Sequence, residues 1–296
     1  MMKFMKVMLL LFTIANLASC STQTEPPLKI IANSWIGYSP LFYAKESGWL
    51  KPLNIQVSTV ISLGESLNIY ETAELDAFTG TQYEYSQAQQ KDSSLLPIMM
   101  FDRSNGGDSV MANQTIKALQ QSTETIDVYL EMHSVNQLIF KDFIKQHQLT
   151  DKTFNFINKD QLKIYSIIKS TRPSNPFIVV TYVPYSQKLA KLGLQELAST
   201  RSGLDLLVVD ALFTPKKTFL QHQTQFAQLK SLINQAIIEL EKNPFHYYEK
   251  VKPHLENTGY EDFQASLKEI EWLNTPLKPE LIKRLNDSHF PTRNLL

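Results

Sequence analysis

The apolar and polar positions from residue 28 onward alternate between strand-length and helix-length patterns. Residues 28–33 form a short apolar run, and residues 53–57 alternate apolar with polar side chains, which is typical of strands. Between them, Ser39-Pro40 is a helix-start signal and Gly48 a helix-end signal. Further strands are predicted near residues 75–78, 96–101, 126–130, 177–182 and 206–209, and helices near 63–74, 83–90, 135–146, 161–170 and 186–192.

This alternation predicts an α/β fold in which mostly parallel sheets are flanked by helices. After Pro215 the pattern is helical to the end of the chain, and residues 219–241 form its longest periodic segment. A length of 296 residues favours two domains, at roughly 100–200 residues each.

The N-terminus follows another pattern. Residues 1–6 contain two lysines and no acid, and residues 7–18 are apolar apart from Thr13 and Asn16. Because a bilayer span needs about 20 apolar residues, this run is too short to cross a membrane and indicates a secretory signal peptide. A membrane anchor or a buried N-terminal helix is the alternative interpretation.

The end of this run, Leu17-Ala18-Ser19-Cys20, resembles the lipobox of bacterial lipoproteins. The resemblance implies that residues 1–19 are removed as a signal peptide and that Cys20 is lipidated. Residues 20–27, which are polar and end in two prolines, then form a tether. We therefore expect a lipid-anchored protein of the cell envelope, on its periplasmic or extracellular face.

Composition and motifs exclude several functions. The 29 basic residues balance the 29 acidic ones, which argues against nucleic-acid binding. One cysteine permits neither an intramolecular disulfide nor a multi-cysteine metal site. The six histidines show no metal-ligand spacing, and the chain has neither a G-x-S-x-G elbow nor a phosphate-binding G-x-x-x-x-G-K loop. We therefore expect no catalysis, no metal and no cofactor.

Five segments resemble periplasmic solute-binding proteins of the nitrate/sulfonate/taurine ABC-transporter group, which includes the THI5/NMT1-like thiamine-pyrimidine binders. They follow one another in that family's order and are residues 34–48 (SWIGYSPLFYAKESG), 74–81 (ELDAFTGT), 101–108 (FDRSNGGD), 131–135 (EMHSV) and 179–184 (VVTYVP). Where the family has a glycine before the serine of the fourth segment, this chain has His133.

The resemblance implies two lobes, each a sheet flanked by helices, with a ligand cleft between them. Residues 28–104 and 206–296 would form one lobe and residues 105–205 the other, with Gly106-Gly107 as a hinge. The implied function is capture of a small organic molecule by a monomeric lipoprotein that delivers it to an ABC importer. The alternative is a ligand-sensing lipoprotein that acts on a transmembrane signalling protein. A THI5-like pyrimidine enzyme is disfavoured, because a single cysteine cannot supply that enzyme's cysteine-rich iron motif.

Candidate ligand residues lie on loops where predicted strands end, as the topology of open α/β sheets favours. Aromatic rings would wall the pocket, serine and threonine would bind the ligand or cap helices, and the aspartates would bind a cation or cap turns. The candidates are Trp35, Gly37, Tyr38, Gly80, Thr81, Asp102, Ser104, Asp108, His133, Ser134 and Tyr182.

The charges among these candidates favour a cationic ligand. Two of them are acids, and the nearby Arg103 should point away from Asp102, because successive side chains of an extended segment alternate. An amine or a nitrogen heterocycle is therefore expected in preference to a sulfonate or nitrate. An anion would have to bind backbone N–H groups near Thr81 and Ser134.

Overall fold

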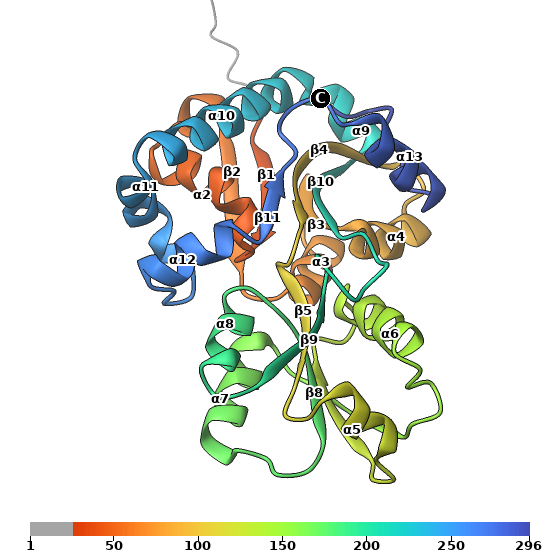
Figure 1. Ribbon diagram of the computed structural model, residues 1–296. Coiled ribbons are helices and arrows are strands. Elements are labelled where there is room, and N and C mark those ends of the chain that lie inside the picture. Colours follow the sequence, from red (N-terminus) through yellow and green to blue (C-terminus); the bar gives the residue numbers. More distant parts are fainter. Residues whose placement is uncertain (1–25) are drawn as a thin grey trace, which may run out of the picture.

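The computed structural model describes residues 26–296, which form two α/β lobes, each built on its own sheet (Figure 1). The predicted signal peptide, the lipidation site Cys20 and most of the predicted tether lie outside the described residues. Within the described range, no helix has both the length and the apolar composition needed to cross a membrane.

The first lobe, uppermost in Figure 1, contains a six-stranded sheet in the order β11-β4-β10-β3-β1-β2. Its strands β2, β1 and β3 are parallel, whereas β10 is antiparallel to both β3 and β4, and β11 is antiparallel to β4. The strands are β1 (Leu28–Asn33), β2 (Ile55–Val60), β3 (Ala77–Thr81), β4 (Leu95–Ser104), β10 (Val209–Pro215) and β11 (Ile270–Trp272).

The second lobe contains a five-stranded sheet in the order β7-β6-β8-β5-β9. Strands β7, β6 and β8 are parallel, and β5 is antiparallel to β8 and β9. The strands are β5 (Asp108–Ala112), β6 (Ile126–Leu130), β7 (Phe154–Asn158), β8 (Phe177–Tyr182) and β9 (Gln195–Ser199).

The sheets are therefore mixed, not mostly parallel as the sequence predicted. The reason is that the chain crosses between the lobes after β4 and again after β9. Strands β5 and β10 enter their sheets from the end where the lobes meet, so they run opposite to β8 and to β3.

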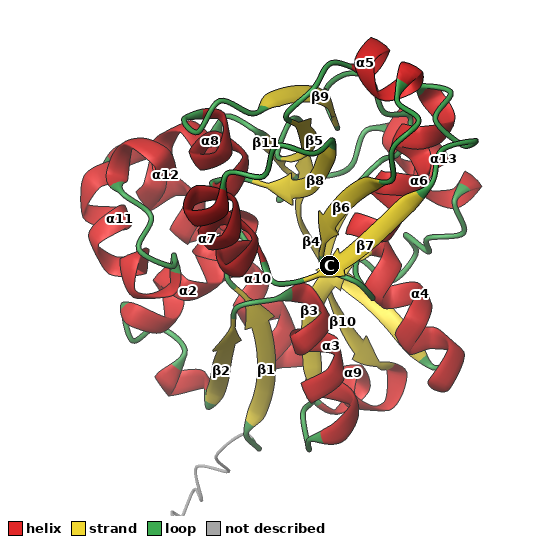
Figure 2. Cartoon of the chain, turned by 90° about the horizontal axis from the view of Figure 1, so that it is seen from below, coloured by secondary structure: helices red, strands yellow, loops and turns green. Residues whose placement is uncertain are grey.

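Helices surround both sheets (Figure 2). Those of the first lobe are α2 (Ser39–Glu46), α3 (Leu63–Thr72), α4 (Gln82–Lys91), α9 (Lys216–Gln221), α10 (Gln223–Lys242), α11 (Pro244–Val251), α12 (Tyr260–Leu267) and α13 (Pro279–Asp287), with short 3-10 turns η1 (Ile36–Tyr38), η2 (Lys51–Leu53) and η3 (Lys252–His254). Those of the second lobe are α5 (Ile116–Gln121), α6 (Asn136–Gln146), α7 (Gln161–Thr171) and α8 (Tyr185–Ala190). The predicted helix 219–241 is divided at His222 into α9 and α10, and the expected all-helical C-terminal region contains strand β11.

The hydrophobic core lies on both faces of each sheet. On β1, Ile30 packs into one cluster and its neighbour Ile31 into another, on opposite faces. On β5, Val110 and Met111 divide in the same way between two clusters of the second lobe. Because both faces are covered by helices, the central strands are apolar at successive positions, as the predicted strand runs were.

Candidate functional site

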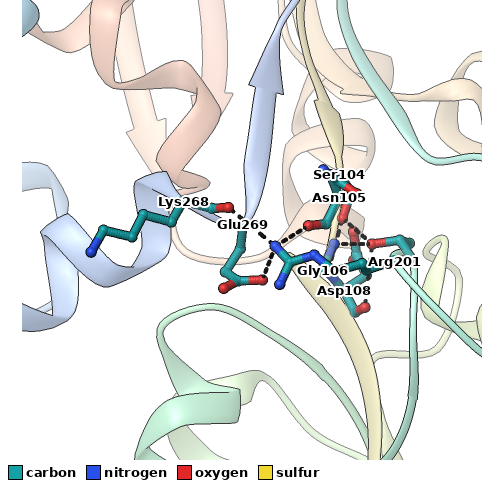
Figure 3. A network of polar contacts seen from close by, with 8 residues as sticks. Ser104, Asn105, Gly106, Asp108, Arg201, Lys268 and Glu269 are labelled. Carbon is teal, nitrogen blue, oxygen red and sulfur yellow. Dashed lines mark hydrogen bonds and ion pairs between the residues drawn. The ribbon is translucent and has the colours of Figure 1, made fainter.

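The two chain segments that cross between the lobes are fixed side by side (Figure 3). The Arg201 guanidinium donates to the Asn105 carbonyl at 2.6 Å and pairs with Glu269 at 2.7 Å. Thr200 Oγ1 accepts from Gly106 N at 2.9 Å and lies 2.8 Å from the Ser104 hydroxyl. Ser104, expected to bind ligand, therefore holds the crossing together, and its hydroxyl also accepts from the backbone N–H of Asp108 at 2.9 Å.

The loop after β1 places two aromatic side chains over two carboxyl groups of the first lobe. The Trp35 indole N–H lies 3.2 Å from one Asp102 oxygen and 3.3 Å from the other, and the Tyr38 hydroxyl donates to Asp210. Asp102 and Asp210 face each other across β4 and β10. Gly37 permits this packing, because a Cβ there would lie 1.7 Å from Asp102 Oδ2.

Glu84 joins the two lobes. Its carboxylate accepts from the backbone N–H of Thr81 at 2.8 Å and from the Thr81 hydroxyl, completing a capping box at the start of α4. The other carboxylate oxygen accepts from the backbone N–H of Val135, at the start of α6 in the second lobe, at 3.1 Å. Gly80 lies under this contact, since a Cβ there would be 3.0 Å from Glu84 Cβ.

The Glu84 carboxylate occupies backbone N–H groups that an anionic ligand would need. Thr81 acts as a helix cap, and two of the N–H groups in question already bind Glu84. Ser134 is also used locally, because its hydroxyl donates to the Glu131 carbonyl at 2.8 Å and accepts from Asn136 N at 3.3 Å.

The remaining predicted residues of the second lobe differ in exposure. Tyr182 is buried, donates its hydroxyl to Glu131 Oε1 at 3.1 Å, and meets Trp35 of the first lobe edge-to-face at 5.8 Å between ring centroids. His133 is exposed and has a φ of 60°, a left-handed conformation that favours glycine. That conformation explains why a glycine suits this position in the family that the sequence resembles.

Five carboxyl groups are buried where the lobes meet, each no more than 4% exposed: Glu84, Asp102, Asp108, Glu131 and Asp210. Across residues 26–296, no lysine or arginine is buried, and the one buried histidine, His222, bonds to Gln225 of α10. Arg103 points away from Asp102, as predicted, and pairs with Glu271 at 2.6 Å. The buried carboxyl groups therefore lack a buried basic partner in the described chain.

Burial is the main cause of raised pKa values for all five groups, because the protein interior disfavours the charged form. The pKa of Asp108 is raised to about 7 and that of Glu131 to about 8. The pKa values of Asp102 and Asp210 are also raised by burial, and their mutual proximity adds to the effect for Asp210. At neutral pH the site can therefore hold protons that a bound cation would displace.

A groove of about 570 Å³ between the lobes reaches Glu131. It is bounded by α3 and α4 on one side and by the loops that follow β6 and β7 on the other. This volume lies within the usual range for small-molecule sites. No group of three or more His, Cys, Asp or Glu side chains in the described residues is arranged to hold a metal ion.

Of the eleven predicted residues, only His133 lines this groove. The other ten are buried, and Trp35 and Tyr182 among them join the two lobes by direct contact. Asp102 and Asp108 belong to strands β4 and β5, and Asp102 accepts from the Trp35 indole N–H. Sequence reasoning missed Glu84, Glu131 and Asp210. The spacing of Thr81 and Glu84, which matches a capping box, was the one local signal for Glu84.

Neither a family model nor a curated protein sequence matches the chain. Solved structures do match. The alkanesulfonate-binding protein SsuA of Xanthomonas axonopodis pv. citri, bound to MOPS, aligns with a TM-score of 0.69 at 13% identity over 92% of this chain and 99% of that one. The aliphatic sulphonate-binding protein SsuA of Escherichia coli aligns with a TM-score of 0.68 at 10% identity over 88% of this chain and 85% of that one.

The nitrate-binding protein NrtA of Synechocystis PCC 6803 aligns with a TM-score of 0.62 at 11% identity, over 81% of this chain and 69% of that one. The chain therefore has the two-lobed fold of the periplasmic binding proteins, which confirms the fold class predicted from the sequence.

Proposed function

We propose that this chain is an extracytoplasmic solute-binding lipoprotein that captures a small organic cation between its lobes and delivers it to an ABC importer. The observation that supports a cation is the set of five buried carboxyl groups with no buried lysine or arginine in residues 26–296. A buried carboxylate needs a partner of opposite charge, because its desolvation is otherwise costly. An amine or a protonated nitrogen heterocycle provides that partner.

The aromatic side chains support the same ligand class. Trp35 and Tyr182 come from different lobes and meet edge-to-face, so closing the lobes brings two aromatic rings against the carboxyl groups. Cations are attracted both to carboxylates and to the faces of aromatic rings. A ligand held in this way binds the closed form better than the open one and so shifts the protein toward closure.

Glu84 argues against an anionic ligand. Its carboxylate accepts from Thr81 N and Val135 N, and Val135 lies at the start of α6, where a sulfonate or nitrate would otherwise find free donors. An entering anion would also approach four other buried carboxyl groups. We therefore infer that this chain differs in ligand charge from the sulfonate- and nitrate-binding proteins that share its fold.

The comparisons favour transport over catalysis. The similar structures are named as binding proteins, and one from Staphylococcus aureus is described as the ligand-binding component of an ABC-type import system. We infer that residues 28–104 and 206–296 move as one lobe against residues 105–205. Sensing by a transmembrane signalling protein is the second candidate, because it would use the same ligand-closed form.

The lipid anchor is tested separately from ligand binding. Cells that express the protein are labelled with palmitate, and the same experiment is done with the Cys20→Ala variant. The proposal predicts label on the wild-type protein and none on the variant. Label that persists without Cys20 would show that lipidation at this residue is wrong.

Ligand class is tested by a thermal-shift screen of the purified protein against amines, nitrogen heterocycles, sulfonates and nitrate. A ligand present at about 100 times its dissociation constant adds roughly 2.7 kcal/mol of stability, which raises the melting temperature measurably. We expect shifts with amines or heterocycles. A shift with sulfonates or nitrate, and none with cations, would overturn the proposed ligand class.

A further inference from the structure

Two of the buried carboxyl groups, Asp102 and Glu131, contact aromatic side chains that pack against each other from different lobes. In the first lobe, the Trp35 indole N–H is 3.2 Å from Asp102 Oδ1. In the second lobe, the Tyr182 hydroxyl is 3.1 Å from Glu131 Oε1. The two rings meet at 5.8 Å between centroids, with an interplanar angle of 86°. Carboxyl groups therefore lie at both ends of this contact between aromatic rings.

The acidic group of the second lobe has an unused acceptor. Glu131 is 3% exposed, and its Oε2 has no hydrogen-bond partner among the described residues. The residue lines the 570 Å³ groove between the lobes. The groove contains one lysine, Lys91, which pairs with Glu71 at 2.5 Å. Because an unsatisfied buried oxygen costs free energy, Glu131 Oε2 marks a position for a donor that the protein does not itself provide.

The acidic group at the Trp35 end is larger and contains residues of both lobes. Asp102 faces Asp210 across the sheet, and Asp108 lies directly opposite Tyr182 in the second sheet. Ionisation of Asp108 opposes that of Asp102, and ionisation of Glu84 opposes that of Asp108, so these carboxyl groups are close enough to repel one another. This inner group and Glu131 are thus two separate attractive positions for positive charge.

We propose that the ligand carries two cationic nitrogen groups joined by an apolar spacer, as in a diamine or a linear polyamine. One nitrogen donates to Glu131 Oε2, the other is held by Asp102 and Asp108, and the spacer lies against Trp35 and Tyr182. This inference rests on the proposed function and specifies its ligand. A ligand with a single charge would leave one of the two acidic positions without a partner.

The test compares a series of terminal diamines with n-alkylamines of the same chain length, by calorimetric titration of the purified protein. Because a hydrogen bond to a charged group contributes about 1.5–3 kcal/mol, the best diamine should bind at least roughly tenfold more tightly than its matching monoamine. This comparison uses the wild-type protein and so does not depend on the folding of any variant.

Two variants then test the position of the second charge. Glu131→Gln keeps the side-chain shape and an acceptor for Tyr182 but removes the charge, so it should abolish the preference for diamines over monoamines. Glu65→Gln, an exposed acid of the same groove, is the matched control and should keep the preference.

The outcomes distinguish this inference from the proposed function. Equal affinity for diamines and monoamines would overturn the two-charge ligand while leaving a cation-binding protein. A diamine preference that survives in Glu131→Gln would overturn the role of Glu131. Absence of binding by every amine and heterocycle, together with binding of an anion, would overturn both proposals.

Discussion

The buried carboxyl groups predict an unusual dependence of stability on pH. An acid whose pKa is higher in the folded protein than in the unfolded chain binds more protons when folded. Its contribution to stability is complete below the unfolded pKa and is lost as the pH rises through the folded pKa. For Asp108 and Glu131, this window extends from their ordinary values of 3.8 and 4.5 to about 7 and about 8.

The size of the effect follows from the same values. One pKa unit corresponds to about 1.4 kcal/mol, so each of these two groups, taken alone, lowers the free energy of unfolding by about 4–5 kcal/mol across its window. The two contributions are not independent of the other buried acids, since Glu84 also raises the pKa of Asp108. Even one such contribution is a large part of the roughly 5–15 kcal/mol that stabilises an ordinary domain.

The assay is urea denaturation of the ligand-free protein at pH values from about 5 to about 9. We expect the free energy of unfolding to fall by several kcal/mol over this range. Glu131→Gln should flatten the fall near pH 8, whereas the exposed control Glu65→Gln should leave it unchanged. A free energy of unfolding that stays constant or rises over the range would refute the reasoning.

Three substitutions test individual contacts by the same denaturation assay. Glu84→Ala should lower the free energy of unfolding by about 2–6 kcal/mol. The reason is that two backbone N–H groups, one in each lobe, each lose an acceptor worth about 1–3 kcal/mol. A decrease below about 1 kcal/mol would contradict this. Gly37→Ala should lower the free energy of unfolding by about 1–3 kcal/mol, because the added Cβ would overlap Asp102. Gly64→Ala is the control and should lower it by nothing, because its Cβ would lie 3.5 Å from the nearest atom, the Met132 carbonyl oxygen. His133→Gly should add about 0.5–1 kcal/mol by relieving a left-handed backbone, whereas His133→Ala should not; a destabilised glycine variant would disprove the backbone argument.

The pattern of apolar and polar residues correctly predicted those helices and strands that depend mainly on neighbouring residues in the sequence. The apolar run at residues 28–33 and the Ser39-Pro40 helix start correspond to β1 and α2. Strand β7 was not predicted, although it pairs with the preceding strand β6. Strands β5, β9 and β11 were also not predicted, because they are short and pair with strands distant in sequence. Their antiparallel direction follows from the two crossings between the lobes, which no periodicity within a single element reveals.

The candidate site likewise contains residues that the sequence could predict and a contact between lobes that it could not. Trp35, Asp102 and Tyr182 were selected because they follow or end predicted strands, and the structure places all three where the lobes meet. The role of Glu84 could not be predicted, because its contact with Val135 joins residues of different lobes. Its capping-box position was visible in the sequence, but that pattern usually stabilises one helix and says nothing about a second lobe.

The most direct test of the central claim, that buried protonated carboxyl groups receive a cation, is a count of protons released on binding. A binding amine from the screen is titrated calorimetrically near pH 7 in two buffers of different ionisation enthalpy, and the difference in heat gives the number of protons exchanged. The raised pKa of Glu131 and of Asp108 predicts net proton release from the protein when the cation binds. Binding that releases no proton, or that takes one up, would contradict the claim.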